Sequence, residues 1–164
     1  MTRRIHIAPP RDTADFDAIA ELVREYAGSL GFSLDYQDFE AELGDLRAKY
    51  GPPGGALLLA RVDGEPAGTV ALRQLETGIG EMKRLYVRPG FRRERTEAGN
   101  SIGRELALRI VEAARVCGHR RLRLDTIGPQ MEPAIRLYRT MGFTEIAPYY
   151  PSPVPGTVYM ELVL

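Results

Sequence analysis

Three consecutive strand-like runs between residues 56 and 87 constrain the fold of this chain more than any other feature. The first run, ALLLARV, is joined to the second, TVALRQ, through Asp63-Gly64, a dipeptide that strongly favours a tight hairpin turn. A further turn at ETGIG leads into the third run, EMKRLYV, residues 81–87. The three runs predict a meander. Strict alternation along the third strand would place Glu81, Lys83, Leu85 and Val87 on one face.

Segments with helical spacing precede and follow this meander. Asp12 or Thr13 can cap a first helix after a short strand at 3–8, and a second helix is expected from about 35 to 50. Later segments predict, in order, a helix at about 102–117, a strand in RRLRLDT, a helix in EPAIRLYRTMGF and a closing strand in TVYMELVL. This order indicates a mixed α/β or α+β single domain.

Composition narrows the classes of function. Lys plus Arg and Asp plus Glu both number 22, so no net charge attracts nucleic acid or an anionic membrane over a distance. Cys117 is the single cysteine, and His6 and His119 are the two histidines, so neither a disulfide nor a metal site is predicted. The N-terminus lacks the pattern of a secretory signal, and no apolar run approaches the roughly 20 residues of a membrane span. We expect a soluble cytoplasmic protein without nucleic-acid or membrane partners, and the sequence leaves a homodimer open.

The stretch FRRERTEAGNSIGREL, residues 91–106, places glycines and polar side chains at the start of the helix expected at 102–117. A helix start has N–H groups without intrahelical partners and carries partial positive charge, so a phosphate fits there. Gly99 and Gly103 would let it approach the backbone, and the neighbouring arginines Arg92, Arg93, Arg95 and Arg104 could hold further oxygens. On its own, however, the loop is better explained by helix capping through Asn100 or Ser101.

The segments EMKRLYVRPGFRR, GNSIGRELA, LRLDT and AIRLYRTMGF, taken in this order, resemble the GCN5-related N-acetyltransferase (GNAT) family. The stretches EMKRLYV, LDT and PVPGTVYMEL are similar to those of several small members. The resemblance implies one GNAT-like domain over residues 1–164, with a mixed, mostly antiparallel central sheet flanked by about four helices. It also implies direct transfer of an acetyl group from acetyl-CoA, the co-substrate, to a small-molecule amine or a protein amino group.

The same resemblance implies where acetyl-CoA binds. The main chain around Leu85 and Val87 would pair with the pantetheine arm, and the amides of 99–104 would receive the pyrophosphate. The implied cofactor-binding residues are Leu85, Val87, Arg92, Gly99, Asn100, Ser101, Ile102, Gly103 and Arg104. About six extra residues, 93–98, depart from the family pattern and predict weaker binding or a loop that orders on binding. A non-catalytic acyl-CoA sensor or an interaction module is therefore the alternative.

Three side chains are candidates for the chemistry. Tyr138 matches a family tyrosine that often protonates the CoA sulfur, although its spacing also fits an aromatic core residue. Glu81 is a candidate base for the amine, with a solvent-facing or ion-paired carboxylate as the alternative. Asp125, which ends its strand, is the second candidate base, and helix capping or a salt bridge competes with that role. The loops at 31–36 and 148–156 could border the acceptor pocket, although turn formation explains their composition equally well.

Overall fold

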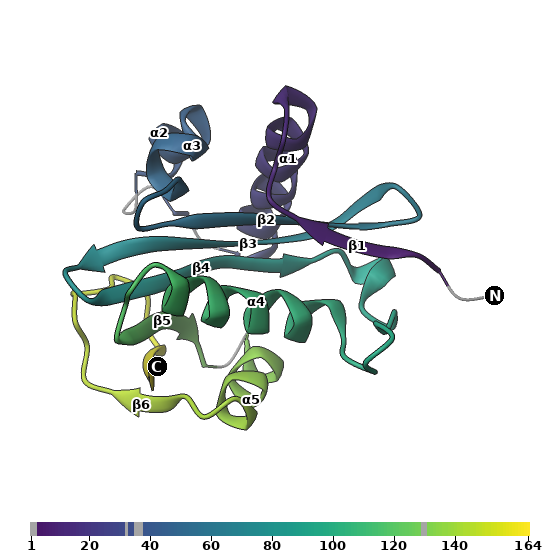
Figure 1. Cartoon of the computed structure of the whole chain (residues 1–164). Coiled ribbons are helices and arrows are strands. Elements are labelled where there is room, and N and C mark those ends of the chain that lie inside the picture. The colour runs from purple at the N-terminus through teal and green to yellow at the C-terminus, as the bar shows by residue number, and fades with distance from the viewer. Residues whose placement is uncertain (1–2, 32, 35–37, 129–130) are drawn as a thin grey trace.

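The computed structural model describes residues 3–31, 33–34, 38–128 and 131–164, and its strands form one seven-stranded sheet (Figure 1). The strand order is β1-β2-β3-β4-β5-β7-β6. All neighbours are antiparallel except β4 and β5, which are parallel. The strands are β1 (Ile5–Ala8), β2 (Ala56–Val62), β3 (Glu65–Glu76), β4 (Ile79–Val87), β5 (Arg121–Ile127), β6 (Thr144–Ile146) and β7 (Thr157–Val163).

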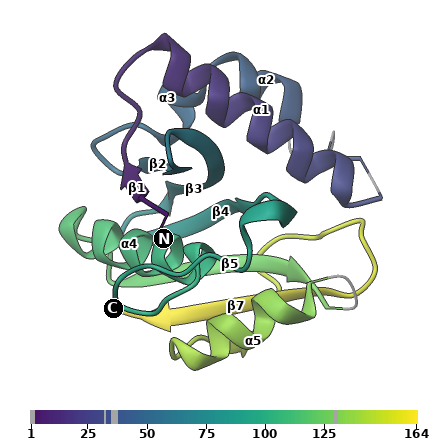
Figure 2. The ribbon, with the colours of Figure 1, turned by 90° about the vertical axis from the view of Figure 1, so that its right-hand side faces the viewer.

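Helices cover both faces of this sheet (Figure 2). On one face lie α1 (Thr13–Ser29), α2 (Phe39–Gly44) and α3 (Leu46–Tyr50), and on the other lie α4 (Ile102–Val116) and α5 (Glu132–Thr140). A short 3-10 turn, η2 (Pro89–Phe91), follows β4. Each face has its own apolar core cluster. The predicted mixed α/β architecture and its hairpin turn at Asp63-Gly64 are confirmed, and both turn residues have the positive φ that such a turn needs.

Two local predictions were wrong. The helix expected at 35–50 is two short helices among the described residues, because Asp45 leaves the helical conformation (φ −151°, ψ 73°) and its side chain caps Ala48 N at 3.0 Å. Residues 35–37, which that prediction included, lie outside the described residues. The strand β6 was not predicted, since its three residues are exposed or half-buried and carry no apolar alternation.

A β-bulge in β4 also corrects the predicted faces of that strand. Thr69 pairs with Tyr86 and Ala71 with Lys83, so β4 carries two residues where β3 carries one. One of the two is Arg84, whose φ is 60°. The bulge reverses the alternation after Lys83: Leu85 and Val87 pack on the α4 side, whereas Tyr86 packs on the α1 side. Glu81 and Lys83 therefore do not share a face with Leu85 and Val87.

The contact between β4 and β5 is short. Its register covers only Ile79–Glu81 of β4 and Arg121–Arg123 of β5. Beyond these pairs, β4 continues along β3 and β5 continues along β7. The two parallel strands therefore diverge toward their carboxyl ends, and the sheet opens between them.

Candidate active site

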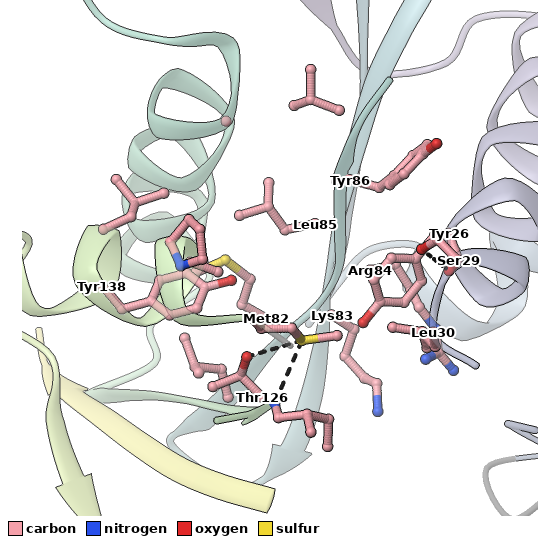
Figure 3. A pocket seen from close by; sticks show the side chains of 18 of the residues that line it. Tyr26, Ser29, Leu30, Met82, Lys83, Arg84, Leu85, Tyr86, Thr126 and Tyr138 are labelled. Atoms are coloured by element: carbon pink, nitrogen blue, oxygen red, sulfur yellow. Dashed lines mark hydrogen bonds between the residues drawn. The ribbon is translucent and has the colours of Figure 1, made fainter. Parts of the chain in front are cut away.

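A cavity of about 510 Å³ occupies this opening (Figure 3). It is bounded by the end of α1, by β4 after the bulge, by the start of α4, and by β5 with α5. Because the opening passes between two strands, residues from both faces of the sheet reach the same space. Its lining includes Tyr26, Leu30, Lys83, Arg84, Leu85, Val87, Arg92, Ser101, Ile102, Gly103, Asp125 and Tyr138.

The start of α4 forms one end of the cavity. Ser101 is the N-cap residue, and its Oγ accepts a hydrogen bond from Arg104 N at 3.1 Å. The N–H groups of Ile102 and Gly103 precede any intrahelical partner and lie in the positive first turn. A Cβ at position 103 would lie 3.7 Å from Val87 Cγ2, so a longer side chain there would extend beside the cavity wall. This end therefore presents backbone donors to an anion.

The extra residues 93–98 form a closed turn. Thr96 N donates to Asn100 O at 2.9 Å, and Arg95 forms an isolated antiparallel bridge with Ser101. The Arg95 side chain also returns to the backbone, donating to Arg92 O at 3.0 Å. The added length is thus absorbed by hydrogen bonds within the loop before the chain enters α4.

Six of the nine residues predicted to bind the cofactor line the cavity: Leu85, Val87, Arg92, Ser101, Ile102 and Gly103. The other three lie beside it. Gly99 has φ 83° in the turn, and Asn100 Nδ2 donates to Glu105 Oε2 at 3.0 Å. Arg104 Nη1 donates to Thr140 Oγ1 on α5 at 2.9 Å.

Tyr138 projects from α5 into the cavity, and its ring packs against Phe143 with centroids 5.6 Å apart (Figure 3). The residue is 6% exposed. Burial raises the pKa of the phenol above its ordinary value, and the nearby Tyr26 and Asp125 raise it further. The phenol therefore keeps its proton at neutral pH. None of the described residues accepts a hydrogen bond from this hydroxyl, so the proton is available to a bound molecule.

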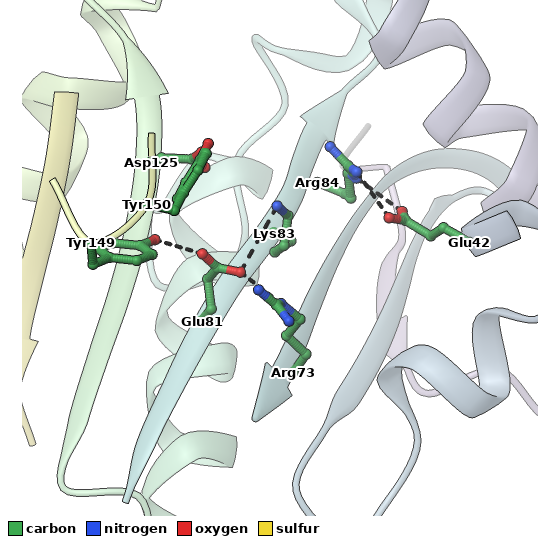
Figure 4. A network of polar contacts seen from close by, with 8 residues as sticks. All are labelled: Glu42, Arg73, Glu81, Lys83, Arg84, Asp125, Tyr149 and Tyr150. Atoms are coloured by element: carbon green, nitrogen blue, oxygen red, sulfur yellow. Dashed lines mark hydrogen bonds and ion pairs between the residues drawn. The ribbon is translucent and has the colours of Figure 1, made fainter. Parts of the chain in front are cut away.

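The two candidate carboxylates occupy different surroundings (Figure 4). Asp125 lies in the cavity lining and accepts a hydrogen bond from the Tyr150 hydroxyl. Glu81 is 1% exposed, and its carboxylate accepts hydrogen bonds from Arg73 Nε at 2.7 Å and from the Tyr149 hydroxyl at 2.5 Å. Asp125 thus meets the cavity directly, whereas Glu81 is enclosed by its partners.

Burial alone would raise the pKa of Glu81, but Lys83, Arg73 and the Tyr149 hydrogen bond outweigh it and hold the pKa below its ordinary value. Lys83 Nζ lies 3.9 Å from Glu81 Oε1. Burial lowers the pKa of Lys83, and the charges of Glu81 and Asp125 oppose that shift.

Sequence reasoning missed a buried ion pair at the bulge. Arg84 donates from Nε and Nη2 to the two carboxylate oxygens of Glu42, both at 2.9 Å. The side chains are 4% and 0% exposed. Glu42 lies on α2, and no local pattern links it to Arg84, which is 42 positions further along the chain. By contrast, Tyr149 and Tyr150 belong to the loop 148–156, for which the sequence left open a place beside the acceptor pocket or ordinary turn formation.

Among the described residues, no helix combines the length and the apolar character that a membrane span needs. Likewise, no group of three or more His, Cys, Asp or Glu side chains in this part of the chain is arranged to hold a metal ion.

The sheet thus opens between two parallel strands, with a helix start at one end of the opening and a buried tyrosine beside it. The chain belongs to the acetyltransferase (GNAT) family, whose model matches residues 16–143. An uncharacterized N-acetyltransferase of Schizosaccharomyces pombe is 38% identical over 160 residues, which cover 96% of this chain and 94% of that protein.

Solved structures share the same fold. An acetyltransferase from Streptococcus agalactiae superposes with a TM-score of 0.77 at 18% identity, covering 98% of each chain. The PaiA N-acetyltransferase of Thermoplasma acidophilum, solved in complex with coenzyme A, gives a TM-score of 0.68 at 17% identity, covering 98% of this chain and 99% of that one. The family predicted from the sequence is confirmed, and with it the class of an acyl-CoA-dependent N-acetyltransferase.

Proposed function

We propose that the protein transfers an acetyl group directly from acetyl-CoA to a primary amine within the cavity between β4 and β5. The observation that carries the proposal is the opening of the sheet after Glu81 and Arg123, which joins the start of α4 to Tyr138 and Asp125 in one space. A two-sided opening lets donor and acceptor approach the same point from opposite faces, as a direct transfer requires.

The donor would occupy the α4 side. The N–H groups of Ile102 and Gly103 would bind the pyrophosphate, and Arg92 would add a charge-assisted contact. Ser101 would leave these two amides open because its side chain caps Arg104 N instead. The edge of β4 at Leu85 and Val87 would pair with the pantetheine arm, since β5 has already diverged there. Gly99, Asn100 and Arg104 would shape the loop and helix around this seat.

Tyr138 would supply the proton for the leaving thiolate. As the amine nitrogen bonds to the acetyl carbon and the carbon–sulfur bond breaks, negative charge develops on sulfur. A buried phenol with a raised pKa is protonated and positioned to donate at that moment. Solvent would then restore the tyrosine proton.

Asp125 would accept the proton that the amine must lose. It lies in the cavity lining, where an acceptor amine can reach it. Glu81, the other candidate, would act indirectly. Because its carboxylate oxygens are already engaged, it would hold the side chains of Lys83 and Tyr149 in position. The base, Asp125, would then lie on β5 and the acid, Tyr138, on α5, and both elements border the same cavity.

Calorimetric titration with acetyl-CoA, followed by detection of free CoA thiol across a panel of amines, tests the proposal. We expect binding together with amine-dependent release of thiol. Binding without release would favour the acyl-CoA sensor, and absence of binding at saturating concentration would leave an interaction module.

Several expectations from the sequence stay predictions. These are a single acetyltransferase domain over residues 1–164, a cytoplasmic location without nucleic-acid or membrane partners, the choice between a small amine and a protein amino group, and the open possibility of a homodimer. Size-exclusion chromatography with light scattering would decide the last of them.

A further inference from the structure

Two cations of β4 border the part of the cavity next to α1 (Figures 3 and 4). The Lys83 side chain is 8% exposed, and its ammonium lies 3.9 Å from Glu81 Oε1. That same oxygen is only 2.7 Å from Arg73 Nε. The closer contact of Glu81 is therefore made to Arg73, and Lys83 belongs to the cavity lining.

Arg84 is the second cation, and it is held rigidly. Its Nε and Nη2 donate to both oxygens of Glu42. A guanidinium has five N–H groups in a fixed plane, so this bidentate pair leaves Nη1 with donors in a defined direction. No described residue accepts a hydrogen bond from Nη1. Arg84 can thus contact a further oxygen without giving up Glu42.

The same cavity lining also contains an acid. Asp125 on β5 lines the cavity, and the Tyr150 hydroxyl fixes one of its oxygens. A carboxylate at this point favours a protonated amine in its neighbourhood. The cavity lining thus offers both cations and a carboxylate to a bound molecule.

Glu42 and Glu81 pair with Arg84 and Arg73, whereas Lys83 and Asp125 both belong to the cavity lining. A bound molecule with a carboxylate beside the two β4 cations and an amine beside Asp125 would place each of its charges next to an opposite one.

We propose that the acceptor is an amino acid, a compound that carries one carboxylate beside its primary amine. Lys83 and Arg84 Nη1 bind the carboxylate, and the amine lies against Asp125. Leu30 and Leu34, each 5% exposed and both in the cavity lining, favour an apolar side chain. The inference rests on the proposed function, because the amino acid is acetylated by the transfer described above.

Pairs of amines that differ in the carboxylate test this inference. L-leucine is compared with isoamylamine, L-phenylalanine with phenethylamine and L-tyrosine with tyramine, and L-leucinamide keeps the α-carbon without the charge. For at least one pair, we expect kcat/KM for the acid to exceed that for its partner by about tenfold to a hundredfold, the effect of one charge-assisted contact. L-leucinamide should behave like isoamylamine.

The Lys83→Met variant should remove most of this preference by raising KM for the acids more than KM for the matched amines. Lys83→Arg should restore part of it, since the cation is kept. The matched control is Lys49→Met, outside the cavity lining, which should keep the preference. A merely structural role of Lys83 would lower the rates of acids and amines together.

The outcomes separate the two proposals. Acetylation of amines without preference for the acids in any pair, or a preference that survives in Lys83→Met, overturns the amino-acid inference and leaves acetyl transfer intact. Failure to acetylate either class, with acetyl-CoA present at saturation, overturns both.

Discussion

The two halves of the cavity are built differently. The α4 half presents main-chain groups, namely the first N–H groups of a helix and the free edge of β4. The half next to α1 presents charged side chains fixed by partners from other elements, such as Arg84 by Glu42 of α2. Under the proposed function, main-chain donors would bind a feature that every acyl-CoA shares, whereas side chains can be exchanged without changing the fold. Donor binding would then depend on the fold, and acceptor choice on the side chains next to α1.

The largest expected effect concerns the residue at the meeting point of the halves. Tyr138→Phe should lower kcat by about 10² to 10⁴, the range of general acid catalysis, because the proton is needed only when charge develops on sulfur. Stopped assays with each amine substrate measure it. The affinity for acetyl-CoA and the melting temperature serve as controls and should change little. An unchanged kcat would remove Tyr138 from the mechanism.

The next effect tests whether the acceptor half is held by its ion pairs. Glu81→Gln should destabilise the protein by about 3 kcal/mol at pH 7, because Arg73 and Lys83 would lose their buried counter-charge. The folded pKa of Glu81 lies below its ordinary value of 4.5, so its stabilisation is present above pH 4.5 and is lost as pH falls through the folded pKa. The variant should therefore show a flatter loss of stability on the acid side.

Urea denaturation between pH 3 and 7 measures this, in steps of roughly half a unit. The control is Glu76→Gln, an exposed carboxylate on β3, which should change stability by less than about 0.5 kcal/mol. Equal effects of the two variants would contradict the ion-pair account.

A third change addresses the donor half. Gly103→Glu should weaken acetyl-CoA binding by about tenfold or more, because its carboxylate would stand beside the pyrophosphate seat and repel it. Calorimetric titration gives the affinity. Leu108→Glu adds the same charge at an exposed position of α4 and should leave binding nearly unchanged. Equal weakening in both would mean that net charge, and not the seat, controls affinity.

The smallest effect is expected from the added loop. Shortening residues 93–98 should change the affinity for acetyl-CoA by less than about threefold, since the turn closes on its own hydrogen bonds and loop length costs little entropy. A tighter complex would instead support the expectation from the sequence that the extra residues weaken the seat. The same titration decides between these results.

The sequence was sufficient to predict the structural features that depend on residues close together in the chain. Periodicity and the Asp63-Gly64 turn were sufficient for the meander and for the order of the longer helices. The start of α4 was recognisable because caps and glycines act within a few residues. The bulge at Arg84 was not, because it depends on register against β3, and strict alternation therefore gave Leu85 and Val87 the wrong face relative to Glu81.

The acceptor half could be predicted least. The Glu42–Arg84 pair and the contact of Tyr150 with Asp125 join residues far apart in the chain, and only the folded arrangement brings them together. Asp125 could be named as a candidate base because the sequence placed it at the end of its strand, although β5 continues to Ile127. The sequence could not show which of the two carboxylates, Asp125 or Glu81, lines the cavity. That depends on which one is enclosed by arginine and tyrosine side chains from other parts of the chain.

Position 84 has to meet two demands that few residue types satisfy together. Its backbone is left-handed, with φ 60°, a conformation that glycine adopts freely and that costs other residues on the order of 1 kcal/mol. Its side chain must also reach Glu42 with two parallel donors. Glycine would relax the backbone and lose the bridge, and lysine would keep a charge but not the paired geometry. A substitution at position 84 would thus either relieve the backbone strain or keep the paired hydrogen bonds to Glu42, but not both.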